Sequence, residues 1–194
     1  MSTPAADELV VLLSEDGRAI GTAPKASVHH ARTPLHLAFS AYLFDADGRL
    51  LLTQRALDKA TFPGVWSNSV CGHPAPGERL DGAVRRRAAD ELGLEVRDLR
   101  LVLPRFAYRA EMDGVVEWEM CPVLVGRADT DPTPDPDEVA GFEWVDWAAF
   151  VAQLREGRDI SVWCRLQVEE LGRLGRAPET WPTAPSSELP PALS

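Results

Sequence analysis

Three Asp-Gly dipeptides, each between two apolar runs, constrain the fold of this chain more than any other feature. Asp16-Gly17 lies in ELVVLLSEDGRAIGT, Asp47-Gly48 lies in HLAFSAYLFDADGRLLLTQR, and Asp113-Gly114 joins RLVLPRFAYRA to GVVEWEMCPVLVG. Asp-Gly is typical of tight hairpin turns, because glycine adopts a positive φ without a steric cost. We therefore expect hairpins at all three places, with strands that follow one another in the sequence running antiparallel.

Helical periodicity is confined to three segments. In ERLDGAVRRRAADELGLEV, apolar residues recur every four positions from Leu80 to Leu92, and Gly93 follows as a candidate C-cap. A short strand, FEWVDW, precedes two further helices, AAFVAQLREG and VWCRLQVEELGRL. Hairpins, one helix, more strands and two closing helices favour an α+β sandwich over alternating βαβ units.

The length allows one sizeable core. With 194 residues, the chain is long enough for a single domain and hardly for two. We assign this domain to residues 8–176 and expect residues 1–7 to be flexible. The tail 177–194, APETWPTAPSSELPPALS, has five prolines in eighteen residues, and this composition predicts disorder.

Charge and composition exclude several classes of function. The net charge of −10 argues against a nucleic-acid partner, which needs a basic surface. No apolar run approaches the ~20 residues of a membrane helix, so no membrane partner is expected. The three cysteines have no framework spacing, which favours free thiols and a cytoplasmic location. A small anionic substrate remains compatible with an acidic protein if metal ions and a few cations reverse the local field.

The histidines and two glutamates suggest a metal site. His29, His30 and His36 lie in HHARTPLH, and His73 lies in CGH. Any one of them alone is more commonly inert. In VEWEM, two further candidates, Glu117 and Glu119, point to the same side of a strand because side chains alternate. Such a set suits a divalent ion with five or six nitrogen and oxygen ligands.

The segment from Gly72 to Leu94 resembles the Nudix signature, G-x5-E-x7-R-E-U-x-E-E-x-G-U, where U is aliphatic. The matching residues are Gly72, Glu78, Arg86, Glu91, Gly93 and Leu94. The resemblance implies a loop–helix–loop whose acidic face binds Mg²⁺ beside a diphosphate. Arg87 and Asp90 replace two glutamates of the pattern, so the metal cluster of a Nudix hydrolase would be impaired here.

A closer resemblance covers most of the chain, from Leu9 to Trp163. The stretches TPLHLAFSAYLF, PGVWSNSVCGHP, FAYRA and EWEMCPV resemble type I isopentenyl diphosphate isomerases, a Nudix-fold family of isoprenoid synthesis. The resemblance implies a single-domain α/β/α sandwich with a mixed sheet. It also implies the interconversion of isopentenyl and dimethylallyl diphosphate by a 1,3-proton shift through a carbocation.

The resemblance further implies a role for individual residues. Cys71 and Glu119 would transfer the protons, with Tyr108 hydrogen-bonded to Glu119. One divalent ion, Mn²⁺, Zn²⁺ or Mg²⁺, would be held by His29, His36, His73, Glu117 and Glu119, with His29 preferred to His30 for its spacing to His36. A Mg²⁺ carried by the diphosphate would be held by Glu91 and the backbone carbonyl of Cys71.

The same resemblance implies how the substrate is held. Arg55 and Lys59 would bind the diphosphate, with Lys25 as a further candidate. Trp66 and Trp163 would line the pocket, where an indole face attracts a cation without trapping it. Trp163 lies in the final helix, which would also act as a lid against water.

Two alternatives compete with the isomerase. A Nudix pyrophosphohydrolase would need the intact acidic helix that Arg87 and Asp90 disturb, and it would give Cys71 no task. A catalytically silent Nudix-like binding module would have no need of Cys71 or of the strand glutamates. For the oligomeric state, we expect a monomer or a weak homodimer.

Overall fold

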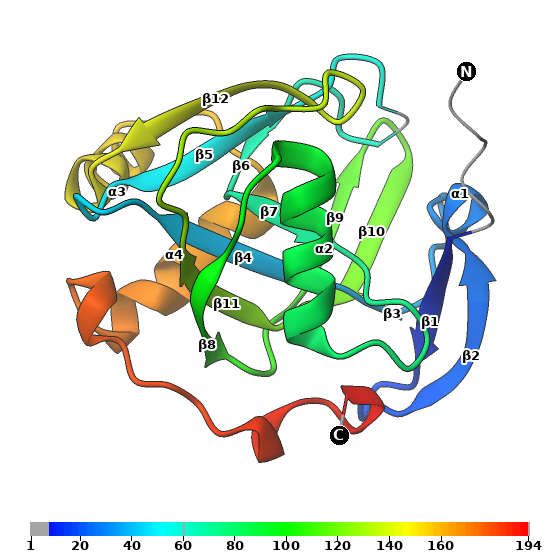
Figure 1. Ribbon diagram of the computed structural model, residues 1–194. Helices are drawn as coiled ribbons and strands as arrows, with labels where there is room; N and C mark the ends of the chain where they lie inside the picture. Colours follow the sequence, from blue (N-terminus) through cyan, green and yellow to red (C-terminus); the bar gives the residue numbers. More distant parts are fainter. Residues whose placement is uncertain (1–7, 60, 194) are drawn as a thin grey trace.

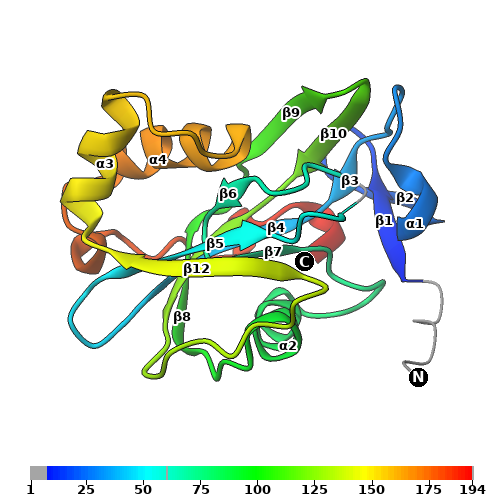
Figure 2. The same cartoon turned by 90° about the horizontal axis from the view of Figure 1, so that it is seen from above.

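The computed structural model describes residues 8–59 and 61–193, which form two mixed β-sheets with helices on both sides (Figures 1 and 2). The strands are β1 Leu9–Leu13, β2 Ala19–Pro24, β3 His36–Leu37, β4 Phe39–Phe44, β5 Leu50–Arg55, β6 Trp66–Ser67, β7 Val70–Gly72, β8 Arg97–Leu103, β9 Ala107–Met112, β10 Val115–Met120, β11 Val123–Arg127 and β12 Val139–Val145. The α-helices are α1 Lys25–Val28, α2 Leu80–Leu92, α3 Trp147–Arg155 and α4 Val162–Leu174. The predicted flexible N-terminus, residues 1–7, lies outside the described residues.

One sheet is the middle layer of the sandwich. Its main path runs β12-β5-β4-β11-β8, with α2 on one face and α3 and α4 on the other (Figure 2). Because strand side chains alternate, Phe39, Ala41 and Leu43 of β4 pack with α2. Tyr42 and Phe44 point to the opposite face, toward α3 and α4. The predicted α/β/α sandwich is therefore confirmed.

Parallel strand pairs make both sheets mixed. The second sheet has the order β2-β1-β3-β10-β9. In it β10 runs parallel to β3, and in the first sheet β11 runs parallel to β4. These pairs join segments about 80 residues apart, and they bring the end of β10 next to His36, the partner of Glu119 in the register.

The three predicted hairpins differ in how far their strands pair. β1–β2 and β9–β10 are antiparallel over their whole length, and at Asp113-Gly114 both residues have positive φ, 51° and 79°. β4 and β5, in contrast, pair only at Phe44 and Leu50. Beyond that point the two strands separate, and β6 pairs with β5 while β7 pairs with β4.

Residues 66–72 follow β5 in the sequence but lie between β4 and β5 in space, where they supply hydrogen bonds that the two strands no longer make with each other. Ser69 Oγ donates to Leu51 O at 2.6 Å and accepts from Leu43 N at 2.8 Å, so one hydroxyl bridges both strands. Asn68 Nδ2 donates to the carbonyl of Ala41 at 3.0 Å. Since buried backbone groups must be paired, these polar side chains stabilise the separation that positions residues 66–72.

Helix α2 ends as predicted at Gly93. This residue has a φ of 63°, a conformation that costs glycine little. Its N–H donates to Ala89 O at 3.0 Å, and the next N–H, that of Leu94, donates to Ala88 O at 3.1 Å. No helix in the described part of the chain is long and apolar enough to cross a bilayer.

The prediction of a disordered tail from residue 177 is wrong for the described residues 177–193. Trp181 is only 2% exposed and packs edge-on against Trp147 with ring centroids 5.0 Å apart. Ala184 N donates to Leu101 O at 2.8 Å, and Ala192 N donates to Gly17 O at 3.0 Å. Proline content suggested disorder, but buried apolar anchors offset the entropy of ordering the segment.

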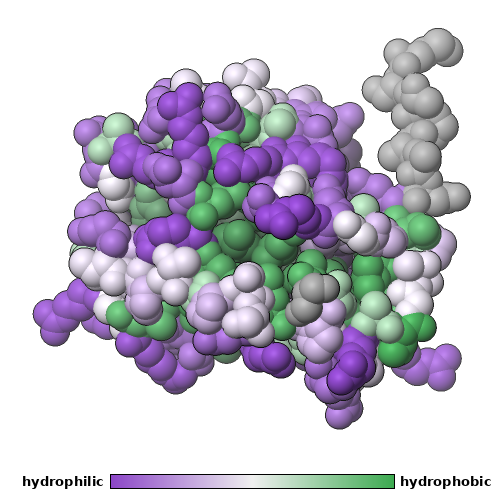
Figure 3. All heavy atoms as spheres, turned by 60° about the horizontal axis from the view of Figure 1, so that its bottom comes forward, coloured by the Kyte–Doolittle hydropathy of each residue, from purple (hydrophilic) through white to green (hydrophobic). Residues whose placement is uncertain are grey.

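The tail links distant parts of the fold. It leaves α4, crosses the lower side of the molecule in Figure 1 and ends near the β1–β2 hairpin. Figure 3, which turns this side forward, shows hydrophobic side chains at its centre with hydrophilic ones around them. Leu189 and Leu193 pack against the core on the α2 side.

Trp181→Ala should test whether the tail belongs to the folded core. Truncation of a buried tryptophan typically costs about 3–5 kcal/mol of unfolding free energy, which urea unfolding would measure. Ser187→Ala, a change at an exposed tail position, is the matched control and should stay within about 0.5 kcal/mol of wild type. Equal stability of the two variants would contradict the packing of the tail.

Candidate active site

Most of the predicted site residues line one cavity of about 430 Å³ between the two sheets. They come from strands β5, β7, β9 and β10, from helices α1, α2 and α4, and from the loops beside them. The predicted residues that line it are Lys25, His29, Arg55, Lys59, Cys71, His73, Glu91, Tyr108, Glu117, Glu119 and Trp163. His36 lies behind this wall, fully buried.

Three imidazoles surround the carboxylate of Glu119. Its Oε1 lies 3.1 Å from His73 Nε2, 3.4 Å from His36 Nε2 and 4.0 Å from His29 Nε2. The ligand atoms that these four side chains offer all lie within 4.8 Å of one another. Strand pairing holds the group, since His36 in β3 is the register partner of Glu119 in β10.

The group fits a divalent metal ion. The buried Nε2 atoms of His29 and His36 form no hydrogen bond with any described residue, which is costly unless a ligand completes the site. His36 Nδ1 lies 2.9 Å from Pro34 O, and such a contact commonly orients the other nitrogen of a metal-binding histidine. Nitrogen and carboxylate oxygen are ligands that Zn²⁺ and Mn²⁺ accept.

The structure also distinguishes His29 from His30, the alternative metal ligand. His30 is exposed, and its Nδ1 accepts a hydrogen bond from Arg32 N at 3.0 Å. His29 instead faces the cavity and Glu119. The structure therefore brings His29, and not His30, into the cluster.

Tyr108 joins the two glutamates of β10. Its hydroxyl lies 2.9 Å from Glu117 Oε2 and 2.7 Å from Glu119 Oε2. Glu117 is not one of the four residues with converging ligand atoms, although it faces the same cavity. Its part as a metal ligand stays a prediction.

The pKa values of the two carboxyl groups are driven apart. Burial, followed by the charge of Glu119, raises the pKa of Glu117 to about 7. Burial would also raise the pKa of Glu119, but its contacts with the three histidines hold it well below its usual value. Burial lowers the pKa of His73 to about 4, so this imidazole is neutral and able to bind a metal at neutral pH.

Cys71 lies in β7, in the segment that separates β4 from β5. Its Sγ is 3.2 Å from Asn68 Oδ1 and 3.5 Å from Ser40 Oγ. Burial raises the pKa of the thiol to about 11. Cys71 therefore carries its proton at neutral pH, which suits a proton donor better than a nucleophile.

A chain of buried hydrogen bonds connects Cys71 to helix α4. Ser67 Oγ donates to Asn68 Oδ1 at 2.9 Å and accepts from Trp163 Nε1 at 2.8 Å. Ser67 Oγ also lies 2.9 Å from Ser161 Oγ, the side chain that caps the start of α4. The thiol and the tryptophan of the predicted lid are thus held by one polar network.

Only one of the two predicted tryptophans reaches the cavity. Trp163 lines it and packs against Tyr108, with ring centroids 5.8 Å apart. Trp66 is not among the described residues that line the cavity; it is half-buried against the core beside α3 and α4. The part of Trp66 in lining the substrate pocket stays a prediction.

Four cations also line the cavity. Lys25, Arg55 and Lys59 are the predicted ones. Arg87, which in the sequence is a departure from the Nudix pattern, lines the same cavity and was not predicted to do so. Arg87 shares a helical face with Glu91, four positions on, and pairs with it. This i, i+4 spacing is the signal in the sequence that could have found it.

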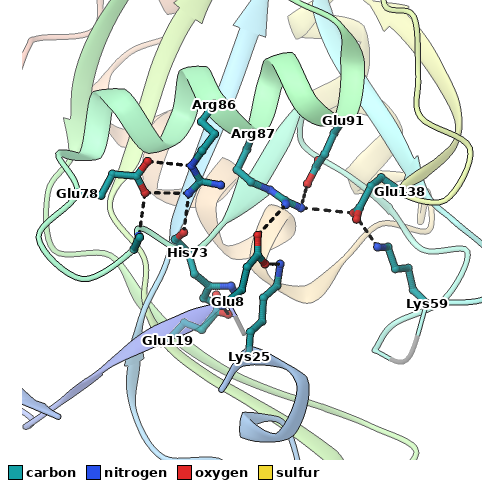
Figure 4. A network of polar contacts seen from close by, with 11 residues as sticks. Glu8, Lys25, Lys59, His73, Glu78, Arg86, Arg87, Glu91, Glu119 and Glu138 are labelled. Atoms are coloured by element: carbon teal, nitrogen blue, oxygen red, sulfur yellow. Dashed lines mark hydrogen bonds and ion pairs between the residues drawn. The ribbon is translucent and has the colours of Figure 1, made fainter. Parts of the chain in front are cut away.

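The other Nudix residues of α2 have a structural role. Arg86 binds Glu78 through two hydrogen bonds, of 2.9 and 2.8 Å, and also donates to the carbonyl of His73 at 3.4 Å. These contacts hold the loop 73–78 against the helix (Figure 4). Asp90 is exposed, so Glu91 is the one acidic residue of 86–91 that lines the cavity.

Comparison with known families places this fold and site among described proteins. A model of the NUDIX domain matches residues 34–173. Isopentenyl-diphosphate Delta-isomerase of Saccharopolyspora erythraea is 57% identical over 187 residues, with 95% of this chain and 96% of that protein covered. The isomerase of Mycolicibacterium vanbaalenii is 60% identical over 169 residues, covering 87% of this chain and 93% of that protein. The isomerase of Rhizobium rhizogenes is 50% identical over 197 residues, covering 99% of this chain and 94% of that protein.

Solved structures share the fold at low identity. DR0079 from Deinococcus radiodurans has a TM-score of 0.66 at 22% identity, covering 84% of this chain and 98% of that one. The MutT protein from Methanosarcina mazei Go1 has a TM-score of 0.57 at 20% identity, covering 72% of this chain and 94% of that one. At this level of identity the likeness concerns the fold alone.

Replacing neighbouring histidines should test the metal cluster. His29→Ala removes a converging nitrogen and should weaken Mn²⁺ binding by at least about tenfold, measured by titration followed by electron paramagnetic resonance. His30→Ala makes the same chemical change one position away and should bind Mn²⁺ like wild type. Equal losses in both variants, or no loss in either, would argue against the cluster as the binding site.

Proposed function

The chain belongs to the isopentenyl-diphosphate Delta-isomerases of the NUDIX family, and from this premise we propose how its residues carry out the reaction. The enzyme interconverts isopentenyl and dimethylallyl diphosphate in isoprenoid biosynthesis. A proton adds to the terminal alkene carbon, the neighbouring substituted carbon becomes the carbocation, and another proton leaves the allylic CH2 group on the other side of that carbon. We assign the two proton transfers to Cys71 and Glu119.

The observation that carries this assignment is the meeting of Cys71, Glu119 and Trp163 around one cavity. Protonation of an unactivated alkene creates a tertiary carbocation, so the site needs an acid, a base and a group that stabilises positive charge. The protonated thiol is suited to the first task and the carboxylate of Glu119 to the second. An indole face attracts a desolvated cation by about 2 kcal/mol or more and does not bond to it.

Glu119 has a second task in this scheme, as a metal ligand with His29, His36, His73 and Glu117. A divalent ion there, Mn²⁺, Zn²⁺ or Mg²⁺, would supply positive charge that fixes the carboxylate and tunes its basicity. Tyr108, hydrogen-bonded to Glu119 at 2.7 Å, orients the same group. Burial raises the pKa of the tyrosine well above its usual value, so its hydroxyl remains a donor.

The diphosphate would lie among Lys25, Arg55, Lys59 and Arg87. Mg²⁺ carried by the substrate would be held by Glu91 and the backbone carbonyl of Cys71. Arg87 adds a bidentate guanidinium, a geometry well matched to phosphate oxygens. Where a Nudix hydrolase has a carboxylate for metal, this chain has a cation for the anionic substrate.

The presence of Arg87 in place of a carboxylate disfavours the alternative functions. A pyrophosphohydrolase needs several carboxylates on α2, and Arg87 and the exposed Asp90 leave Glu91 as the acidic residue of the Nudix segment 86–91 at the cavity. A silent binding module would not need a thiol and a metal-binding carboxylate facing the same cavity. We propose in addition that the enzyme works in the cytoplasm as a monomer or weak homodimer, without a nucleic-acid or membrane partner.

Cys71→Ala should lower turnover by about 10²–10⁴-fold, the usual contribution of a positioned acid or base. The readout is proton NMR of isopentenyl diphosphate in D₂O, where deuterium incorporation reports the proton shift directly. Cys164→Ala removes a buried thiol that contacts the hydroxyl of Tyr42 and is not among the described residues that line the cavity, and this variant should retain near wild-type turnover. Near wild-type turnover by the Cys71 variant would refute its catalytic role.

Removal of divalent ions should abolish isomerisation, since both proposed metal sites contribute to the reaction. Adding Mg²⁺ alone should restore the activity only if Mg²⁺ also occupies the histidine site; otherwise Mn²⁺ or Zn²⁺ is needed as well. Phosphate release, assayed in the same samples, should stay at background. Full activity in a rigorously metal-free sample would rule out the metal-dependent scheme.

A further inference from the structure

Three of the four cations of the cavity are already paired with carboxylates of the protein (Figure 4). Lys25 Nζ lies 2.5 Å from Glu8 Oε2, and Lys59 Nζ lies 2.7 Å from Glu138 Oε2. Arg87 contacts Glu91, Glu138 at 3.4 Å and Glu8 at 3.7 Å. Arg55 differs, because it donates to the neutral carbonyl and hydroxyl of Thr61.

Glu138 is the carboxylate that bridges two of these cations. Its loop is attached to α2, where Asp135 N donates to Glu91 O at 2.8 Å. The same loop is attached to the end of β5, where Ala56 N donates to Glu138 O at 3.0 Å. The backbone therefore holds Glu138 between the helix that carries Arg87 and the loop that carries Lys59.

Carboxylates cancel the charge of three of the four cations in the cavity, and Arg55 is the one whose charge they leave. Lys25, Lys59 and Arg87 carry three positive charges, and Glu8, Glu91 and Glu138 carry three negative ones. A diphosphate carries several negative charges at neutral pH, so it meets little net attraction and the repulsion of three carboxylates. The chain as a whole, with a net charge of −10, adds no long-range attraction for an anion.

Stability does not explain these pairs. The side chain of Glu138 is 29% exposed and that of Glu8 is 42% exposed, against 10% for Glu91. Partly exposed ion pairs contribute little to folding. Glu8 and Glu138 are therefore partly accessible to solvent, whereas Glu91 is buried in α2.

We propose that Glu138, with Glu8 in support, determines specificity for diphosphate that arrives with a divalent cation. This inference rests on the proposed diphosphate end of the cavity. By neutralising Lys59 and Arg87, Glu138 lowers the affinity of the site for metal-free diphosphate and for other free phosphates. A divalent cation offsets the repulsion, so the metal complex binds in preference.

Glu138→Gln tests the proposal by calorimetric titration with inorganic diphosphate. Metal-stripped protein in metal-free buffer should bind the probe about tenfold more tightly than wild type, because one repelling charge is lost. With saturating Mg²⁺ the affinity should change by less than about threefold. The ratio of the two affinities, and hence the preference for the metal complex, should fall.

Asp137→Asn is the matched control. It changes the net charge by the same amount at the neighbouring position, which is exposed and does not line the cavity among the described residues. Its two affinities should equal those of wild type. Circular dichroism of all three proteins in metal-free buffer establishes that they are folded before titration.

Two results would overturn the inference. Weaker metal-free binding by the Glu138 variant would mean that Glu138 holds the cations in place for the substrate. Unchanged metal-free binding, relative to the Asp137 variant, would mean that Glu138 has no part in selection. In either case, turnover of isopentenyl diphosphate by wild type would leave the proposed function intact, whereas absence of both turnover and Mg²⁺-dependent diphosphate binding in wild type would remove the function itself.

Discussion

The separation of β4 and β5 is the constraint on which the rest of the site depends. Two strands that begin as a hairpin at Phe44 and Leu50 give up their mutual hydrogen bonds after one residue pair. The separation is stabilised by the pairing of β7 with β4 and of β6 with β5. Buried side chains of Ser69, Asn68 and Thr53 add hydrogen bonds to backbone groups nearby. The same insertion delivers Cys71 to the cavity and connects its thiol, through Asn68 and Ser67, to Trp163 in α4.

The cavity also contains charged and polar groups that the protein alone does not balance. Glu117 and Glu119 lie side by side in a buried site, and their pKa values diverge because both cannot ionise there without a nearby cation. The Nε2 atoms of His29 and His36 form no hydrogen bond among the described residues, and a divalent ion would give them a partner. Elsewhere in the cavity, three of the four cations are matched by carboxylates. An acidic protein can thus bind an anionic substrate when metal ions supply the positive charge that offsets the carboxylates and the phosphates.

Local pattern was sufficient for much of the fold. The Asp-Gly turns, the end of α2 at Gly93 and the two closing helices follow from interactions within a few residues, and the structure confirms them. Alternation along β10 correctly placed Glu117 and Glu119 on one side. The tail was the main error, because its prolines are visible in the sequence while the buried site of Trp181, beside Trp147, is not.

The sequence by itself determined which chemical groups are present: a thiol, a set of histidines and strand glutamates, and cations in a Nudix-like segment. Only the tertiary structure decided how they meet. His29 was separated from His30, and Arg87 became a cavity residue. Parallel pairing of β3 with β10, and the position of residues 66–72 between β4 and β5 in space, join segments that are distant along the chain. Pairing between distant strands depends on the whole core packing at once, and no local spacing of residues encodes it.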